Sequence, residues 1–233
     1  MTNYVIIGDI HSQKANFQRA LDWIDKNVEN PHIVQLGDVF DSRNSYSDSV
    51  GVYKTIQQLG DKITVIQSNH QWKLYRYLIG NNVTLNGSIS QTIKEFEDSD
   101  VSIEELKLWL ENLPFAVAFK DENNLEYRAA HAFFNRRLYV PHEYSGVHCI
   151  NEVTRKSRDN CLYGLIRRAE DQNERVVWWN EKNDSEFIRV AGHYHTIYYS
   201  QTNKNLVLDG GCGGEDGGTL PIFVTNSQTL LTF

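Results

Sequence analysis

The strongest constraint on the fold of this 233-residue chain is a strand–loop–helix pattern that occurs three times before residue 80. Each copy starts with a short apolar run, passes through a polar loop and continues with helical periodicity. The apolar runs are 4–7, 33–36 and 63–67, and the helical segments are 13–28, 49–59 and 71–79. Strands that alternate with helices pair in parallel, so we expect the three polar loops to meet at one edge of a sheet.

The rest of the chain has a different pattern of predicted secondary structure, with one more amphipathic helix at 103–113 followed by a strand-rich region. Strands at 115–119 and 125–130 flank a polar turn and are expected to form a hairpin. Residues 132–160 show no strong period and are predicted to be a long loop. Further strands are predicted at 176–179, 187–191, 206–208, 221–224 and 229–233. The pattern predicts an α/β fold with two sheets packed face to face and helices outside.

Composition limits the class of protein. A chain of 233 residues with 40% hydrophobic content can bury one sizeable core, so residues 1–233 are expected to form a single domain. No stretch approaches the roughly 20 apolar residues of a membrane span, and three cysteines without CxxC spacing indicate no disulfide framework. We therefore expect a cytoplasmic protein. Its net charge of −7 argues against tight binding to long duplex DNA.

The candidate site consists of polar residues that come directly after predicted strands. An Asp in such a position is often only a helix cap, and a lone His is usually a hydrogen-bonded polar residue, so the set as a whole carries the argument. Its members are Asp9, His11, Asp38, Asn69, His70, His131, His193 and His195. Carboxylate, imidazole and amide ligands suit Mn, Fe or Zn, and the lack of cysteine ligands favours an open catalytic site.

Two neighbouring cations need a bridging carboxylate, and Asp38 is the natural candidate. Such a pair lowers the pKa of a shared water enough to give hydroxide near neutral pH. The sequence therefore predicts a hydrolytic dimetal centre.

The motifs resemble those of the calcineurin-like metallophosphoesterase superfamily, whose pattern is GDxH, GDxxD, GNH, a lone H and GHxH. In this chain they are Gly8-Asp9-Ile10-His11, Gly37-Asp38-Val39-Phe40-Asp41, Ser68-Asn69-His70, His131 and Gly192-His193-Tyr194-His195. The resemblance implies two mixed β-sheets packed as a sandwich and flanked by helices, in four α/β/β/α layers. It also implies two divalent metal ions, with Mn favoured and Fe, Zn or Ni compatible.

The resemblance further implies a role for each residue of the motifs. One metal would be held by Asp9, His11, Asp38 and His195, and the other by Asp38, Asn69, His131 and His193. His70 would be the general acid, oriented by Asp41, while dimetal-bound hydroxide attacks a phosphate mono- or diester.

The likeness to branches of the superfamily is mixed. The segments 69–74 and 80–83 resemble the group of bacterial and phage protein phosphatases, bis-nucleoside tetraphosphatases and the phosphatase module of polynucleotide kinase-phosphatase. The segment 37–43 is instead similar to the repair-nuclease branch. The substrate stays open between a phosphoprotein, a nucleotide and an RNA end. Alternatives are a DNA or RNA nuclease, and a non-catalytic metal-binding scaffold, against which the retained ligands and His70 argue.

Three residues are candidates for binding the substrate phosphate: Asn69, Arg43 and Arg137. Ser42 stands where the protein-phosphatase branch has its phosphate-binding Arg, and Arg43 comes one residue later. Arg137 lies soon after His131. It is equally expected to bind the substrate phosphate or to be a solvated loop arginine. Two other departures are Ser68 in place of Gly and Gln71 in place of an acidic residue. We expect these to affect turn geometry and metal affinity.

Overall fold

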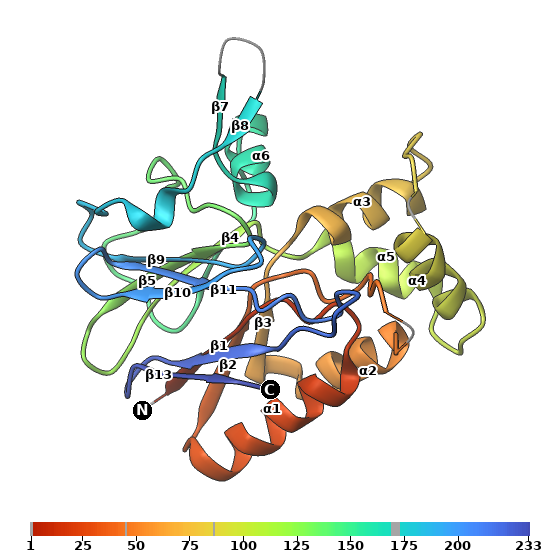
Figure 1. Ribbon diagram of the computed structural model, residues 1–233, viewed down its shortest axis with the longest axis horizontal. Helices are drawn as coiled ribbons and strands as arrows, with labels where there is room; N and C mark the ends of the chain where they lie inside the picture. Colours follow the sequence, from red (N-terminus) through yellow and green to blue (C-terminus); the bar gives the residue numbers. More distant parts are fainter. Residues whose placement is uncertain (1, 45, 86, 169–172) are drawn as a thin grey trace.

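The computed structural model describes residues 2–44, 46–85, 87–168 and 173–233, and it contains two β-sheets stacked face to face (Figure 1). The first sheet has the strand order β13-β12-β1-β2-β3. The strands β1, β2 and β3 pair in parallel, whereas β12 and β13 are antiparallel to their neighbours. Their bounds are Asn3–Ile7, Pro31–Gln35, Ile63–Val65, Pro221–Val224 and Thr229–Thr232. The expected parallel arrangement of the first three strands is confirmed.

The second sheet has the strand order β10-β11-β9-β5-β4-β6 and is also mixed. In it β5 (Glu126–Ala130), β9 (Ile188–Ala191) and β11 (Asn205–Leu208) run in parallel. The antiparallel strands are β4 (Ala116–Lys120), β6 (His148–Ile150) and β10 (Ile197–Ser200). A separate hairpin of β7 (Ile166–Arg168) and β8 (Asn173–Arg175) projects away from this sheet (Figure 1).

The core between the sheets is built from alternate residues of the strands, because successive side chains of a strand point to opposite faces. Ile6 and Val34 of the first sheet meet Tyr127, Ile188 and other apolar side chains of the second sheet. All four are fully or almost fully buried. Complete burial of such side chains contributes about 1.5–3 kcal/mol each, so this layer fixes how the two sheets face each other.

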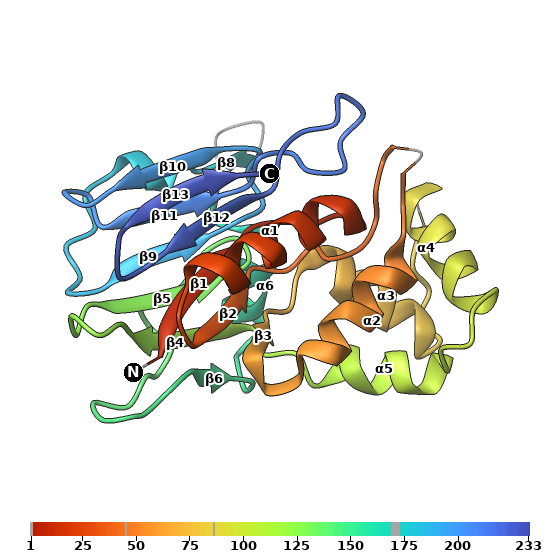
Figure 2. The same ribbon diagram turned by 90° about the horizontal axis from the view of Figure 1, so that it is seen from below.

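Helices cover the outer faces of the sandwich. The first sheet is covered by α1 (Lys14–Asn27) and α2 (Ser49–Leu59), which pack on it through one apolar cluster (Figure 2). Beside edge strand β3 lie α3 (Asn69–Leu78), α4 (Gly87–Glu97) and α5 (Ile103–Glu111). On the second sheet lie α6 (Arg155–Tyr163) and the 3-10 turn η2 (Trp178–Asn180), while η1 (Gly60–Lys62) precedes β3. No described helix is long and apolar enough to span a membrane.

Some predictions of local structure are wrong. The segment 132–160, predicted to be a loop, contains β6 and the first part of α6. Most of α6 is polar, and its buried residues Cys161 and Leu162 are adjacent, so the sequence shows no helical period. The strand predicted at 176–179 is replaced by η2. Helix α4 and strand β10 had not been predicted at all.

Candidate active site

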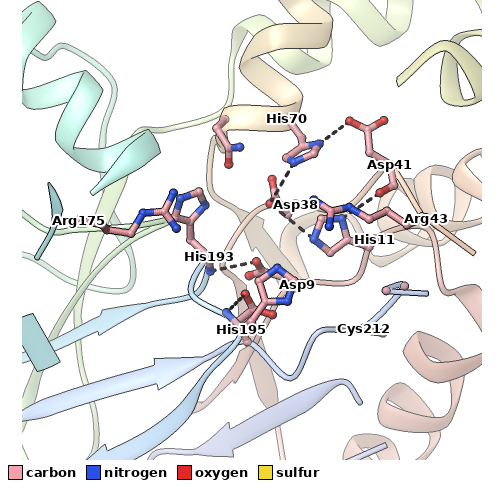
Figure 3. Close-up of a pocket in the computed structure, with 14 residues that line it drawn as sticks. Asp9, His11, Asp38, Asp41, Arg43, His70, Arg175, His193, His195 and Cys212 are labelled. Atoms are coloured by element: carbon pink, nitrogen blue, oxygen red, sulfur yellow. Dashed lines mark hydrogen bonds and ion pairs between the residues drawn. The ribbon is translucent and has the colours of Figure 1, made fainter. Parts of the chain in front are cut away.

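The candidate site lies where loops from both sheets meet at the carboxyl ends of their parallel strands. From the first sheet come the residues after β1, β2 and β3, and from the second those after β5 and β9. A pocket of about 220 Å³ opens there (Figure 3). Of the residues that sequence motifs single out, it is lined by Asp9, His11, Asp38, Asp41, Asn69, His70, His193 and His195. The predicted convergence of the polar loops is therefore present.

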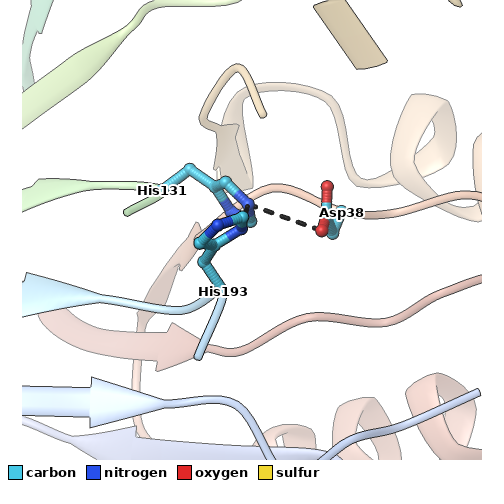
Figure 4. Close-up of side chains that lie close together, drawn as sticks. All are labelled: Asp38, His131 and His193. Atoms are coloured by element: carbon cyan, nitrogen blue, oxygen red, sulfur yellow. Dashed lines mark hydrogen bonds and ion pairs between the residues drawn. The ribbon is translucent and has the colours of Figure 1, made fainter. Parts of the chain in front are cut away.

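Asp38 lies at the centre of this group. Its Oδ2 is 3.4 Å from His131 Nε2, 3.6 Å from His11 Nε2 and 4.0 Å from His70 Nε2. Ligand-type atoms form two compact groups, one of Asp9, His11 and Asp38 and the other of Asp38, His131 and His193 (Figure 4). Because Asp38 belongs to both groups, its carboxylate is in the position that a bridging ligand requires.

Backbone carbonyls set the tautomers of two of these histidines. His131 Nδ1 lies 2.8 Å from the carbonyl oxygen of Leu36, and His11 Nδ1 lies 3.0 Å from that of Phe40. A carbonyl oxygen only accepts, so in each ring Nδ1 carries the proton and donates it. Each Nε2 then faces Asp38, which is the arrangement found in metal-ligating histidines.

The pocket also contains buried acceptor atoms without partners. Asp9 Oδ1, Asp38 Oδ1 and His193 Nε2 are buried and make no hydrogen bond. Burial and the neighbouring carboxylates Asp209 and Asp38 raise the pKa of Asp9 well above its usual value. Burial, together with His131, lowers the pKa of His193 to about 3, so this ring is neutral. Buried electron-pair donors that lack positive partners fit divalent cations, and the oxygen and imidazole donors fit Mn, Fe or Zn.

The remaining proposed ligands are Asn69 and His195. Asn69 Oδ1 lies 2.8 Å from His131 Nε2, within the second group of donors. His195 is more exposed, lines the pocket, and its backbone N–H donates to Asp209 Oδ2 at 2.6 Å. Sequence reasoning had not assigned Asp209 a role, and the structure shows that it holds the loop of His195 in place.

The backbone of the site is strained. Ten described residues other than glycine have positive φ, and six of them belong to these loops: His11, Ser12, Asp38, Asp41, His193 and His195. Such left-handed conformations are unfavourable for these residue types and persist only where the surrounding structure enforces them. Gln35 helps to enforce them, since its amide nitrogen donates to the carbonyl oxygens of Gly8 and Gly37, which precede Asp9 and Asp38. The clustering of strain here is typical of a functional site.

His70 is part of a chain of hydrogen bonds. Its Nδ1 lies 2.7 Å from Asp41 Oδ2, and Thr92 Oγ1 donates to Asp41 Oδ1 at 2.8 Å. Burial alone lowers the pKa of His70, but the nearby carboxylates Asp38 and Asp41 outweigh it and raise the pKa to about 9. The ring is thus held in its protonated form with Nε2 turned toward Asp38. Sequence reasoning missed Thr92 because α4 itself had not been predicted.

The two departures from the family motif compensate each other. Ser68 has φ −123°, an ordinary extended conformation, so the turn does not need glycine here. Its side chain caps α3, accepting from Gln71 N, and donates to Gln71 Oε1 at 2.6 Å. Gln71 Oε1 also accepts from Val39 N at 3.3 Å. The pair therefore ties the Asp38 loop to the Asn69 loop without a charge.

Three arginines are candidate ligands of a phosphate group, two from the structure of the pocket and one from the sequence alone. Arg43 lines the pocket, and its backbone N–H donates to the carbonyl oxygen of Gly213 at 2.8 Å. Arg175 of β8 also lines the pocket, opposite Arg43 and beside His193 (Figure 3). Sequence reasoning missed Arg175, since no motif surrounds it. Arg137 does not line this pocket and instead lines a second cavity.

A sandwich of mixed sheets with these donors at the strand ends is the architecture of a metal-dependent hydrolase. Residues 2–213 match the family described as Calcineurin-like phosphoesterase, and the chain belongs to that family, as its motifs predicted. It is therefore a hydrolase that acts on phosphoester bonds.

Similar proteins agree with this class. The bis(5'-nucleosyl)-tetraphosphatase PrpE [asymmetrical] of Anoxybacillus flavithermus is 25% identical over 229 residues, which cover 91% of this chain and 87% of the relative. The protein of the same name from Bacillus subtilis is 26% identical over 228 residues, covering 90% and 86%. Among crystal structures, a putative diadenosine tetraphosphatase superposes with a TM-score of 0.64 at 18% identity, covering 99% of this chain and 92% of the other.

A protein serine/threonine phosphatase from Saccharomyces cerevisiae has a TM-score of 0.59 at 12% identity, covering 100% of this chain and 79% of the other. At such identities the two structures show the fold alone. The predicted fold class is confirmed.

Proposed function

We propose that this chain hydrolyses a bis(5'-nucleosyl) tetraphosphate with the help of two divalent cations. The carboxylate of Asp38, shared by both groups of ligand atoms, carries the dimetal part of the proposal. The substrate class is supported by relatives named as tetraphosphatases, which match about nine-tenths of the chain. Phosphoproteins and RNA ends remain as competing substrates, to be separated by experiment.

The family resemblance assigns each cation its ligands, and the two groups of donor atoms support three members of each set. Asp9, His11, Asp38 and His195 would hold one, and Asp38, Asn69, His131 and His193 the other. Manganese suits this mixture of oxygen and nitrogen donors, and Fe, Zn or Ni are compatible. When bound, the cations supply an acidic water as nucleophile and neutralise charge on the phosphate.

His70 acts on the leaving group in this proposal. With its pKa raised to about 9, the ring carries a proton near neutral pH and can donate it to the departing oxygen. Asp41 accepts from Nδ1 and so leaves Nε2 facing the pocket. Thr92 fixes the carboxylate of Asp41 in turn, which makes it a positioning residue.

Arg43 and Arg175 would bind phosphate oxygens. They enter the pocket from opposite sides (Figure 3), and a guanidinium can donate two parallel hydrogen bonds to a phosphate. Asn69 adds an amide group from the first turn of α3. A substrate with several phosphates would be held at one phosphate by these groups while its chain extends out of the pocket.

The test is a substrate panel with Mn-loaded protein. A bis-nucleoside tetraphosphate, a phosphopeptide, an RNA with a terminal phosphate and single-stranded DNA are compared by kcat/KM, with products separated by chromatography. We expect the tetraphosphate to be hydrolysed at least tenfold faster than the others. Asp38→Ala protein, prepared in parallel, excludes a contaminating phosphatase. Faster dephosphorylation of the phosphopeptide, or faster cleavage of the single-stranded DNA, would refute the proposed substrate class. Two bound Mn ions without any turnover would support the alternative of a non-catalytic metal-binding scaffold.

A further inference from the structure

A second cavity lies on the outer face of the second sheet, beneath η2 and beside α6. Its volume is about 500 Å³, and it shares no lining residue with the catalytic pocket. Two of the side chains that line it are acidic, Glu181 and Asp184. Five are basic: Arg136, Arg137, Lys156, Lys182 and Arg189. Such an excess of positive charge is unexpected in a chain whose net charge is −7.

Arg189 forms the floor of this cavity. It belongs to β9, where Ile188 and Val190 face the core between the sheets, so Arg189 points to the opposite face. Its guanidinium carbon lies 4.7 Å from the ring centre of Phe133 and 5.4 Å from that of Trp178. The two rings fix the direction of the guanidinium.

The charge of Arg189 has no anionic partner within the described part of the chain, where no carboxylate lies within ion-pair distance. Its Nη2 makes one long hydrogen bond, 3.4 Å, to Asn183 Oδ1, and its buried Nε makes none. Burial and the nearby Arg136 lower its pKa to about 10, and the carboxylate of Glu181 opposes this effect only in part, so the surroundings disfavour its charge. Contacts with aromatic rings stabilise a cation but leave its N–H donors unpaired.

We propose that this cavity binds a small anion that carries a phosphate group, with Arg189 at the floor and Arg136 and Arg137 at the rim. A phosphate would accept hydrogen bonds from the planar guanidinium and offset the repulsion between Arg189 and Arg136. A small ligand fits better than a long polyanion, because the basic side chains line a cavity of about 500 Å³ and the chain as a whole is acidic. Arg137, considered from the sequence as a ligand of the substrate phosphate, lines this cavity and not the catalytic pocket.

The phosphate group could come from inorganic phosphate or from a nucleotide. Calorimetric titrations of Mn-loaded protein with inorganic phosphate and with a methylene-bridged nucleoside triphosphate separate the two. We expect two sites per chain for at least one of these probes. Equal affinities at the second site would identify free phosphate as the ligand, and at least tenfold tighter binding of the nucleotide would identify a nucleotide. Absence of a second site for both probes would overturn the proposal.

Variants test whether the second binding site is this cavity. Arg189→Met should weaken it by roughly tenfold or more, since the change removes the guanidinium that would donate to the phosphate at the floor of the cavity. Arg43→Met, the matched change in the catalytic pocket, should weaken only the other site. Exposed Arg136 and Arg137, both changed to Gln, test the rim without disturbing the core and should weaken the second site roughly twofold to fivefold. Unchanged second-site binding in the double variant, or its loss in Arg43→Met, would refute the assignment even if Arg189→Met does not fold.

Discussion

The catalytic pocket and the Arg189 cavity are opposite in charge. In the pocket, buried Asp9 and Asp38 have oxygens without hydrogen-bond partners, whereas in the cavity the buried Nε of Arg189 has none. Both violate the rule that buried polar atoms are paired. An unpaired buried charge indicates a ligand of opposite charge, so the pocket is expected to attract cations and the cavity an anion.

The two regions also differ in backbone conformation. Six residues of the catalytic loops have positive φ, whereas no described residue that lines the cavity does, glycine aside. Strain of this kind is characteristic of sites where reacting groups must be held in one arrangement. The cavity has ordinary backbone and aromatic walls, which suits binding alone. Variants in the pocket should therefore affect turnover, and variants in the cavity should affect binding.

The largest effect is expected from Asp38→Ala. Loss of the carboxylate shared by both groups of ligand atoms should lower turnover at least about 10³-fold, a fraction of the 10⁶-fold or greater acceleration typical of enzymes. Steady-state assays with added Mn measure this. The matched control is Asp209→Asn, since Asp209 lines the same pocket but accepts from backbone N–H groups. Because Asp209 also holds the loop of His195, the control should lose some turnover, and a loss equal to that of Asp38→Ala would contradict the special role of the shared carboxylate.

The next largest effect is expected from His70→Asn, which should keep metal binding but lower turnover of an alkyl phosphate about 10²–10⁴-fold, the usual contribution of a general acid. The leaving group provides the control. An ester of an acidic phenol departs without a proton, so its hydrolysis should fall much less than that of an alkyl phosphate when chemistry limits both. Asp41→Asn should show a milder form of the same selectivity. Equal losses on both esters would contradict the role of His70.

A smaller effect is expected from the arginines of the pocket. Arg175→Met and Arg43→Met should each lower kcat/KM roughly tenfold to a hundredfold, because a hydrogen bond to a charged group is worth about 1.5–3 kcal/mol. Arg189→Met serves as the control, being the same change in the cavity outside the pocket. If Arg189→Met lowered kcat/KM as much as Arg175→Met, the proposed separation of the two regions would be wrong.

The smallest effect is expected from Thr92→Val, which keeps the shape of the side chain and removes its hydrogen bond to Asp41. Thr92 acts on His70 only indirectly, by orienting the carboxylate of Asp41, so kcat on an alkyl phosphate should fall by only roughly twofold to tenfold. The loss should be smaller on an aryl ester, as for His70→Asn. Thr55→Val is the matched control, because Thr55 bonds only within α2, to the carbonyl oxygen of Gly51. Comparable losses in both variants would point to stability as the cause.

The residues of the site that could be predicted are those that come directly after the ends of strands. Asp9, Asp38 and Asn69 come after parallel strands, whose carboxyl ends necessarily share one edge, so local sequence was sufficient. Arg175 and Thr92 were missed for the opposite reason. They reach the site from a hairpin and from α4, elements whose placement depends on tertiary packing and not on a local motif.

The Arg189 cavity could not be predicted either. Its members come from segments more than fifty residues apart, such as Arg136 and Arg189, and no spacing links them. Helix α6, which forms one side, has too few apolar residues to show a period. Charged side chains in such segments are usually solvated, and only the folded arrangement shows that Arg189 is largely enclosed and lacks an anion.

Counting bound metal ions is the most direct test of whether Asp38 joins two cation sites. Wild-type protein is loaded with Mn, freed of excess metal and analysed for Mn per folded chain, alongside Asp38→Ala and His195→Ala. We predict two ions in the wild type, a large loss from both sites in Asp38→Ala, and a loss confined mainly to one site in His195→Ala. A wild-type stoichiometry that never exceeds one in fully folded protein would contradict the account.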